Sequence, residues 1–113
     1  MMSKKEITII VKSKPFSNIR YYEALRIAAG LWEHKINLIW MGDGIYAVLK
    51  NADRTLTSPL IKEFPGLEFN LYVEEEGLEK RGFRTGDIIQ NIKVINRDEI
   101  AKLLLKTEAS LVC

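Results

Sequence analysis

The chain has 113 residues, of which 47% are hydrophobic and 28% are charged, and its formal net charge is +2. This length predicts one domain, residues 1–113, large enough to bury a core without the help of a metal or a disulfide. A net charge so close to zero argues against direct nucleic-acid binding, which normally needs a clustered basic excess.

The first predicted element is a strand over residues 6–12, EITIIVK. Its β-branched and almost continuously apolar run is typical of a strand buried on both faces. The run is too short to span a membrane and lacks a small-residue cleavage pattern, so we expect neither a membrane segment nor a secretory signal. After the turn SKPFSN, Ser17 or Asn18 can cap a helix predicted over 19–34, where apolar residues recur at helical spacing.

A second apolar strand is predicted over residues 36–41, INLIWM, and it runs directly into the turn GDG. Apolar residues three and four apart predict a short helix over 45–51, IYAVLKN. A loop, ADRTLTSP, follows at 52–59, and PLIKEF at 59–64 is predicted to be another short helix.

The third predicted strand, LEFNLYV at 67–73, alternates apolar and polar residues, as expected of a strand with one buried face. The segment EEEGLEKRGF, residues 74–83, follows it directly. We expect a short helix there that ends at Gly82, because glycine readily adopts the left-handed conformation that terminates helices.

The end of the chain repeats the pattern of strand and helix. A strand is predicted over 92–95, a helix over 96–109 that is capped by Asn96 or Asp98, and a last strand over 109–112. Strands alternate with helices throughout, which predicts an α/β fold, namely a three-layer α/β/α arrangement with a mainly parallel five-stranded sheet.

In an open parallel sheet, sites form outside the carboxyl ends of the strands. Four stretches are predicted to share that edge: SKPFSN, MGDG, EEEG and the terminal Cys113. Any active site is therefore expected to draw its residues from these stretches.

The GDG turn, formed by Gly42, Asp43 and Gly44, admits several roles. The glycines allow a sharp turn, and Asp43 can cap a helix or point a carboxylate into a cleft. A glycine-rich turn before a helix can also hold an anion, so a small-ligand or anion-binding module is one alternative function. The turn lacks the further residues of a dinucleotide fingerprint or a P-loop. A phosphoacceptor aspartate would need an acidic pair after the first strand, where SKPF stands.

The three consecutive glutamates, Glu74 to Glu76, also admit several roles. At a helix start they are stabilised by the positive end of the helix dipole, which is a sufficient structural reason for them. They can also form an acidic contact for a partner, or an acid/base pair. Arg81 and Arg84 can pair with these glutamates or with an acid of a partner. The spacing of oxygen ligands shows no metal-site signature, so we expect no metal and no cofactor.

The single histidine and the single cysteine limit the possible chemistry. His34 lies in a predicted turn between helix and strand. Because it is the only histidine, a histidine-based metal cluster or triad within one subunit is excluded. Because Cys113 is the only cysteine, no intrachain disulfide can form, which fits a cytoplasmic location. Cys113 is also the only possible thiol nucleophile. It is an inert tail residue if buried, or a sulfur carrier if exposed near positive charge.

Four segments, in this order, resemble the DsrE/DsrF-like sulfur-relay family, and most closely its DsrF/TusC-type subunit. They are KPFSNIRYYEALRIAAGL, IWMGDGIYAVLK, LYVEEEGLEKRGF and NRDEIAKLLLKTEASLVC. The resemblance runs almost from end to end. It implies a small α/β/α domain that assembles into homo-oligomers, trimers or hexamers, or into hetero-oligomers with DsrE-like and DsrH-like sister subunits.

The resemblance also implies a role in passing persulfide sulfur, either towards 2-thiolation of tRNA or in sulfur oxidation. In active members a cysteine at or near the end of the third strand carries the sulfur, whereas this sequence has Glu74 there. A carboxylate cannot form a persulfide. The resemblance therefore favours an accessory or structural subunit without catalytic activity, and the alternative is a sulfurtransferase that uses Cys113.

Overall fold

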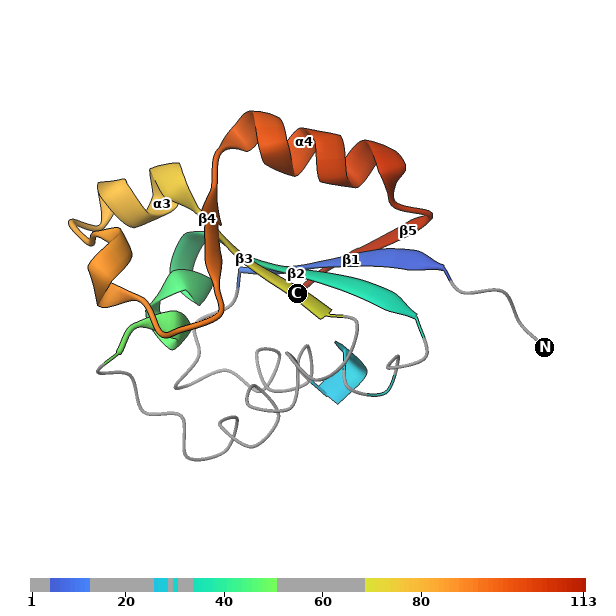
Figure 1. The fold of residues 1–113 in the computed structure, drawn as a ribbon, viewed down its shortest axis with the longest axis horizontal. Coiled ribbons are helices and arrows are strands. Elements are labelled where there is room, and N and C mark those ends of the chain that lie inside the picture. Colours follow the sequence, from blue (N-terminus) through green and yellow to red (C-terminus); the bar gives the residue numbers. More distant parts are fainter. Residues whose placement is uncertain (1–4, 13–25, 29, 31–33, 51–68) are drawn as a thin grey trace.

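The computed structural model describes residues 5–12, 26–28, 30, 34–50 and 69–113. Five strands form one sheet in the order β4-β3-β2-β1-β5, and every pairing is parallel (Figure 1). The strands are β1 (Glu6–Val11), β2 (Lys35–Trp40), β3 (Phe69–Glu74), β4 (Lys93–Ile95) and β5 (Ala109–Val112). The predicted α/β fold with a five-stranded parallel sheet is confirmed.

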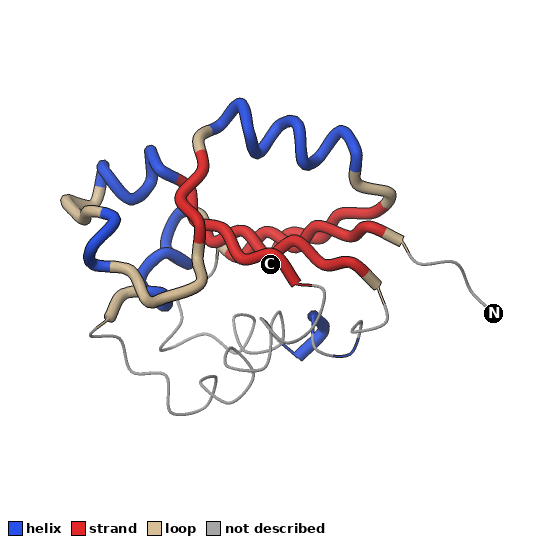
Figure 2. The backbone as a smooth tube through the Cα atoms, in the orientation of Figure 1, coloured by secondary structure: helices blue, strands red, loops and turns tan. Residues whose placement is uncertain are grey.

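Helices lie on both sides of the sheet (Figure 2). α4 (Arg97–Lys106) covers one face, while the 3-10 helix η1 (Gly42–Val48) and the helical residues 26–28 lie on the other side. α3 (Glu75–Lys80) and the 3-10 helix η3 (Thr85–Asp87) are at the carboxyl edge of the sheet, which is at the left in Figure 1. We name the two faces of the sheet the α4 face and the η1 face.

The helix expected over 45–51 is displaced towards the N-terminus. η1 begins at Gly42 and ends at Val48, so the glycine turn belongs to the helix. Leu49 is extended and forms an antiparallel bridge with Ile88, and the N–H of Ile89 donates to the Val48 carbonyl at 2.9 Å. These long-range backbone contacts end the helix where the local spacing would have continued it.

Other predictions fall partly or wholly on residues that the structure does not describe. Of the helix expected over 19–34, residues 26–28 and 30 are described as helical. The loop at 52–59 and the helix at 59–64 lie outside the described residues.

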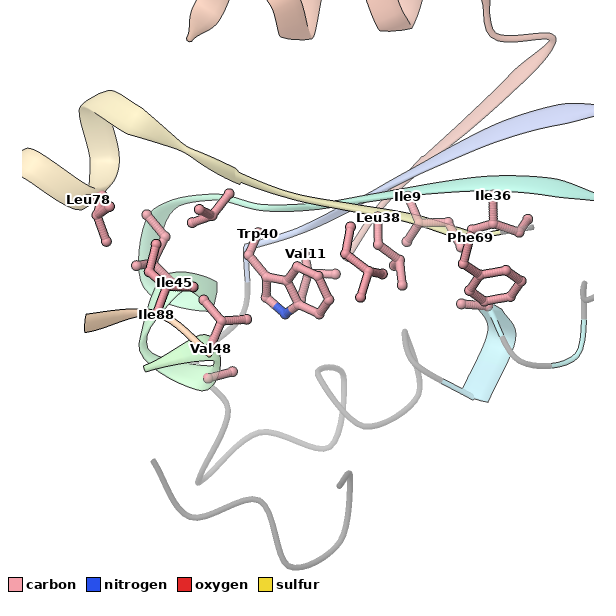
Figure 3. Packing of buried hydrophobic residues seen from close by; sticks show 14 of the residues in the cluster. Ile9, Val11, Ile36, Leu38, Trp40, Ile45, Val48, Phe69, Leu78 and Ile88 are labelled. Atoms are coloured by element: carbon pink, nitrogen blue, oxygen red, sulfur yellow. The ribbon is translucent and has the colours of Figure 1, made fainter. Parts of the chain in front are cut away.

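The two faces of the sheet have different cores because side chains alternate along each strand. On the η1 face, Ile9, Leu38, Trp40 and Val73 are buried in one large cluster that also includes Val48 of η1 (Figure 3). On the α4 face, a smaller apolar cluster joins Ile39, Ile95 and Ile100.

The rest of the α4 face carries a ladder of polar side chains in place of an apolar core. The register places Thr8 opposite Asn37, and Asn37 opposite Asn70. The Asn70 amide donates to the Asn37 carbonyl oxygen at 3.1 Å, and the Asn37 amide donates to the Glu6 carboxylate at 2.8 Å. The Thr8 hydroxyl forms a hydrogen bond with the Thr107 hydroxyl just beyond α4. Buried polar groups are costly unless hydrogen-bonded, so these contacts make the polar ladder tolerable inside the fold.

Glu6 closes this polar ladder at the amino end of β1. The hydrogen bond from Asn37, supported by Lys35 and Lys106, holds the pKa of the Glu6 carboxyl below its ordinary value of 4.5, although partial burial opposes the shift. Lys35 Nζ and Lys106 Nζ lie 3.9 and 3.6 Å from the two carboxylate oxygens. The folded protein therefore binds the Glu6 proton less readily than the unfolded chain does.

This difference predicts how Glu6 affects stability at acid pH. Because the folded pKa is lowered, the stabilisation is present above the unfolded pKa and is lost as pH falls through the folded pKa. We expect Glu6→Gln to reduce the loss of unfolding free energy between about pH 6 and about pH 3, measured by urea denaturation at each pH. Glu79→Gln, at an exposed position on α3 without an ion pair among the described residues, should keep the wild-type pH dependence. An acid-induced loss as large in Glu6→Gln as in wild type would contradict the assignment.

Candidate functional site

The carboxyl ends of the strands bring together charged side chains from elements that are distant in sequence. Asp43 comes from η1, Glu74 ends β3, Arg81 follows α3, and Arg97 is the first residue of α4. We name these four residues, with Glu76 of α3, the carboxyl-edge cluster. Three of its residues, Asp43, Glu74 and Arg81, are candidates that the sequence offered for a site at this edge.

Arg81 connects α3 to η1. Its guanidinium donates from Nη2 to the Asp43 carboxylate at 3.2 Å and from Nη1 to the Gly77 carbonyl at 3.1 Å. It also lies 5.8 Å from the centre of the Tyr46 ring, within the range of a cation–π contact. Among the residues that the structure describes, Arg81 therefore pairs with Asp43 and not with the glutamate cluster that was one of its expected partners.

The end of α3 positions Arg81 for this role. Gly82 has φ +76°, and its N–H donates to the Glu79 carbonyl while the N–H of Phe83 donates to the Leu78 carbonyl. These two hydrogen bonds are the Schellman arrangement that ends a helix on a glycine. The predicted helix stop at Gly82 is confirmed. Arg84, in contrast, is exposed and uses its backbone N–H to bind Asp87.

Glu74 is a buried carboxylate at the end of β3, with only 7% of the residue exposed. Arg97 Nε lies 3.8 Å from its carboxylate and 2.9 Å from that of the more exposed Glu76, so one guanidinium serves both glutamates. Glu75 and Glu76 occupy the first turn of α3, as expected from the helix dipole. Gly77 leaves room for the Glu74 side chain, because a Cβ at position 77 would lie only 2.7 Å from Glu74 Oε1.

Arg97 was missed by the sequence reasoning. It is the second residue after β4, and β4 ends beside the carboxyl end of β3, where Glu74 pairs with Ile95. The rule that sites lie beyond the carboxyl ends of parallel strands would have pointed to it if the segment after the fourth strand had been included.

The GDG turn has a structural reason for its glycines. Gly42 has φ +51°, and a Cβ on Gly44 would overlap the Val11 carbonyl group, at 2.9 Å from its carbon atom. Met41 N–H donates to the same Val11 carbonyl at 3.0 Å, which holds the turn against the end of β1. The Asp43 carboxylate forms an ion pair with Arg81. Anion binding at this turn stays a prediction.

Cys113 extends the β5 ladder beyond the end of the strand. Its N–H donates to the Ile10 carbonyl and its carbonyl accepts from Lys12 N–H, each at 2.8 Å. The residue is partly exposed and packs against the core cluster of the η1 face, whereas Glu74 lies on the α4 face. Because β1 and β2 separate β5 from β3, three strand spacings, or about 14 Å, lie between Cys113 and the Glu74 position. The structure does not bring the thiol and Glu74 together.

The described residues contain no cluster of three or more histidine, cysteine or acidic side chains that could hold a metal ion. His34 accepts a hydrogen bond from the Lys5 backbone N–H at 3.1 Å, which gives the imidazole a structural partner at the start of β2. Within the same described part of the chain, no helix is long and apolar enough to cross a membrane.

Known proteins share this architecture. The model of the DsrE/DsrF-like family matches residues 5–112. The ychN protein from E. coli has a similar structure, with a TM-score of 0.85 and 17% sequence identity over 96% of this chain and 99% of that one. MTH1491 from Methanobacterium thermoautotrophicum, a protein of unknown function, has a TM-score of 0.76 and 12% identity over 97% and 100%. No curated protein matches the chain.

The close approach of Gly44 to β1 can be tested by adding one methyl group. We expect Gly44→Ala to lower the free energy of unfolding by about 2 kcal/mol, because the Cβ forces the turn away from Val11. Gly86→Ala is the matched control, since a Cβ at Gly86 meets no atom within 4 Å. Urea denaturation of both variants measures the difference, and equal stabilities would show that the turn relaxes without cost.

The two ion pairs of Arg97 can be tested by measuring which of them, that with Glu74 or that with Glu76, contributes more to stability. We expect Arg97→Met to destabilise the protein by about 1 kcal/mol, because it leaves the buried Glu74 charge without its cation. Glu74→Gln should abolish most of this cost, whereas Glu76→Gln should not, since pairs between exposed groups contribute little even at 2.9 Å. Double-mutant cycles by urea denaturation measure both couplings. A larger coupling to Glu76 would mean that proximity outweighs burial here.

Proposed function

The chain belongs to the DsrE/DsrF-like family, and from this premise we propose that it is a non-catalytic subunit of an oligomeric sulfur-relay assembly. One observation carries the proposal. The position at the end of β3, where the resemblance implies a sulfur-carrying cysteine in active members, holds the buried Glu74. A carboxylate has no sulfur to accept a sulfane atom, so this corner cannot carry persulfide.

The contacts of the carboxyl-edge cluster support a structural role. Its basic side chains are paired with its acidic ones, Arg81 with Asp43 and Arg97 with Glu74 and Glu76. Each ion pair joins two different elements, so the cluster fixes α3 against η1 and α4 against β3. Such pairs stabilise a corner of the fold and leave no free base or nucleophile in it.

The proposed assembly accounts for apolar surface on the last turn of α4 and on β5. Leu105 is 87% exposed and Val112 is 66% exposed, with Leu104 and Leu111 partly exposed beside them in sequence. Burial of apolar surface of this kind is what drives association between subunits. We propose that the subunit is of the DsrF/TusC type, that it works in the cytoplasm, and that it forms a trimer or hexamer alone or with DsrE-like and DsrH-like sisters.

A second candidate function rests on Cys113. Its thiol is free and partly exposed, and two backbone hydrogen bonds hold the residue at the carboxyl edge. In this alternative the Cys113 thiolate attacks the terminal sulfur of a donor persulfide. The donor leaves as a thiolate, and Cys113 keeps the transferred sulfur as its own persulfide.

Sulfur loading separates the two candidates. Wild type, Cys113→Ser and the double variant Glu74→Cys/Cys113→Ser are incubated with a cysteine desulfurase and cysteine, and intact mass is measured before and after reduction. We expect no reducible sulfur adduct on wild type or Cys113→Ser. The double variant should gain one, because it places the only thiol of the chain at the end of β3.

The controls decide how each result is interpreted. An adduct on wild type that Cys113→Ser abolishes would overturn the accessory role and establish Cys113 as the carrier. Circular dichroism must show that the double variant is folded before its mass is compared. Light scattering after size exclusion tests the assembly separately, and a monomer at micromolar concentration that associates with no sister subunit would contradict it.

A further inference from the structure

A cavity of about 340 Å³ lies on the α4 face, between α4 and the β4 side of the sheet. Tyr72, Lys93 and Ile95 line it from the strands, and Glu99, Lys102, Leu103 and Lys106 line it from α4. We name it the α4 pocket. None of its residues belongs to the carboxyl-edge cluster or to the polar ladder, and neither the proposed function nor the family comparison depends on it.

Strand register and helical spacing bring these side chains together. Tyr72 pairs with Lys93 across β3 and β4, and Glu74 pairs with Ile95 two residues later, so all four lie on the α4 face. Along α4, Glu99, Leu103 and Lys106 recur at intervals of four and three residues, which places them on one side of the helix. The pocket is thus built from three elements, β3, β4 and α4, which the fold brings together.

The charges that line the α4 pocket are not balanced. Lys106 pairs with Glu6 outside the pocket at 3.6 Å, and Glu99 is the N3 residue that accepts from the Asn96 backbone N–H in the capping box. Lys93 and Lys102 pair with no carboxylate among the described residues. Lys93 and Lys102 are thus two ammonium groups without an ion pair in a lining whose one carboxylate is Glu99, and an anion placed between them would pair with both.

The wall of the pocket adds a hydrogen-bond donor and apolar surface. The Tyr72 hydroxyl has no hydrogen-bond partner in the part of the chain that the structure describes. Burial, followed by the Glu6 and Glu99 carboxylates, raises the pKa of Tyr72 above its usual 10.0, so the hydroxyl keeps its proton and can donate. Ile95 is buried and Leu103 is half-buried, and they give the same pocket an apolar side.

We propose that the α4 pocket binds a small phosphomonoester with an apolar body. Its volume is at the lower end of the range of about 300–1,000 Å³ for ligand sites, which limits the ligand to a compact molecule. A phosphomonoester dianion neutralises both unpaired lysines and accepts a hydrogen bond from Tyr72, while its body rests on Ile95 and Leu103. A monocarboxylate carries one negative charge fewer and would pair less strongly with the two lysines.

Phenyl phosphate is the probe that carries both features. Titration into ¹⁵N-labelled full-length protein, followed by amide chemical shifts, should show saturable binding with shifts centred on β4 and α4. Inorganic phosphate lacks the apolar body, benzoate has a single charge, and benzyl alcohol is neutral. We expect each of these to bind at least about tenfold more weakly than phenyl phosphate.

Substitutions assign the binding to this pocket. Lys93→Met/Lys102→Met should weaken phenyl phosphate binding by about tenfold or more, and Tyr72→Phe should weaken it by a smaller factor. Lys80→Met is the matched control, because Lys80 is an exposed lysine at the end of α3 and outside the pocket. Lys93 and Lys102 are both exposed, so the double variant should fold, and its amide spectrum checks this.

The outcomes divide clearly. Saturable binding that the double variant loses and Lys80→Met keeps supports the proposal. No saturable binding of phenyl phosphate, or an equal loss in Lys80→Met, overturns it and leaves the lysines as a solvated surface. Equal affinities for phenyl phosphate and benzoate would overturn the preference for a dianion. Shifts centred on the GDG turn would place the anion on the η1 face and overturn its assignment to the α4 pocket.

Discussion

The register of β2 between β1 and β3 is the constraint on which the rest of the structure depends. In this register Thr8, Asn37 and Asn70 lie side by side on the α4 face, and each finds a hydrogen-bond partner. A slip of β2 by one residue would turn Asn37 into the apolar core, away from Thr8 and Asn70, and would turn the buried Leu38 and Trp40 out of that core. The hydrogen-bonded ladder therefore disfavours other registers of β2 against β1 and β3. Apolar side chains alone discriminate less between registers, because their contacts are not directional.

The same register decides what meets at the carboxyl edge. Because β3 ends level with β4, Glu74 comes next to Ile95 and within reach of Arg97, although 22 residues separate the two charges in sequence. Because β2 ends beside Val11, the chain turns into η1 at a point where only glycine fits at position 44. Asp43 is then directed to Arg81. The cluster is thus a product of strand alignment, and its charges pair with each other before any partner or substrate is considered.

How far the sequence could predict this molecule follows from the range of the interactions involved. The strands and the Gly82 stop are encoded within a few residues by apolar alternation and a left-handed turn, and they were predicted correctly. The start of the last helix was predicted with Asn96 or Asp98 as its cap, and Asn96 is the residue that caps it. The end of η1 was not, because the bridge between Leu49 and Ile88 that terminates it joins distant segments. The partners of Arg81 and Arg97 depend on the same long-range alignment. Local patterns could place these arginines on the edge of the sheet but could not assign their carboxylates.

α4 is the element that connects the two regions of possible function. Its first residue, Arg97, holds the Glu74 corner, and its later turns form one wall of the α4 pocket. Tyr72 and Glu74 stand two residues apart on the same face of β3, so the pocket and the corner share a strand as well as a helix. A ligand that binds between Lys93 and Lys102 would bind only where α4 lies against the sheet, and by linkage it would stabilise that position. Since the same packing holds Arg97 over Glu74, such a ligand would also strengthen the carboxyl-edge cluster without contacting it.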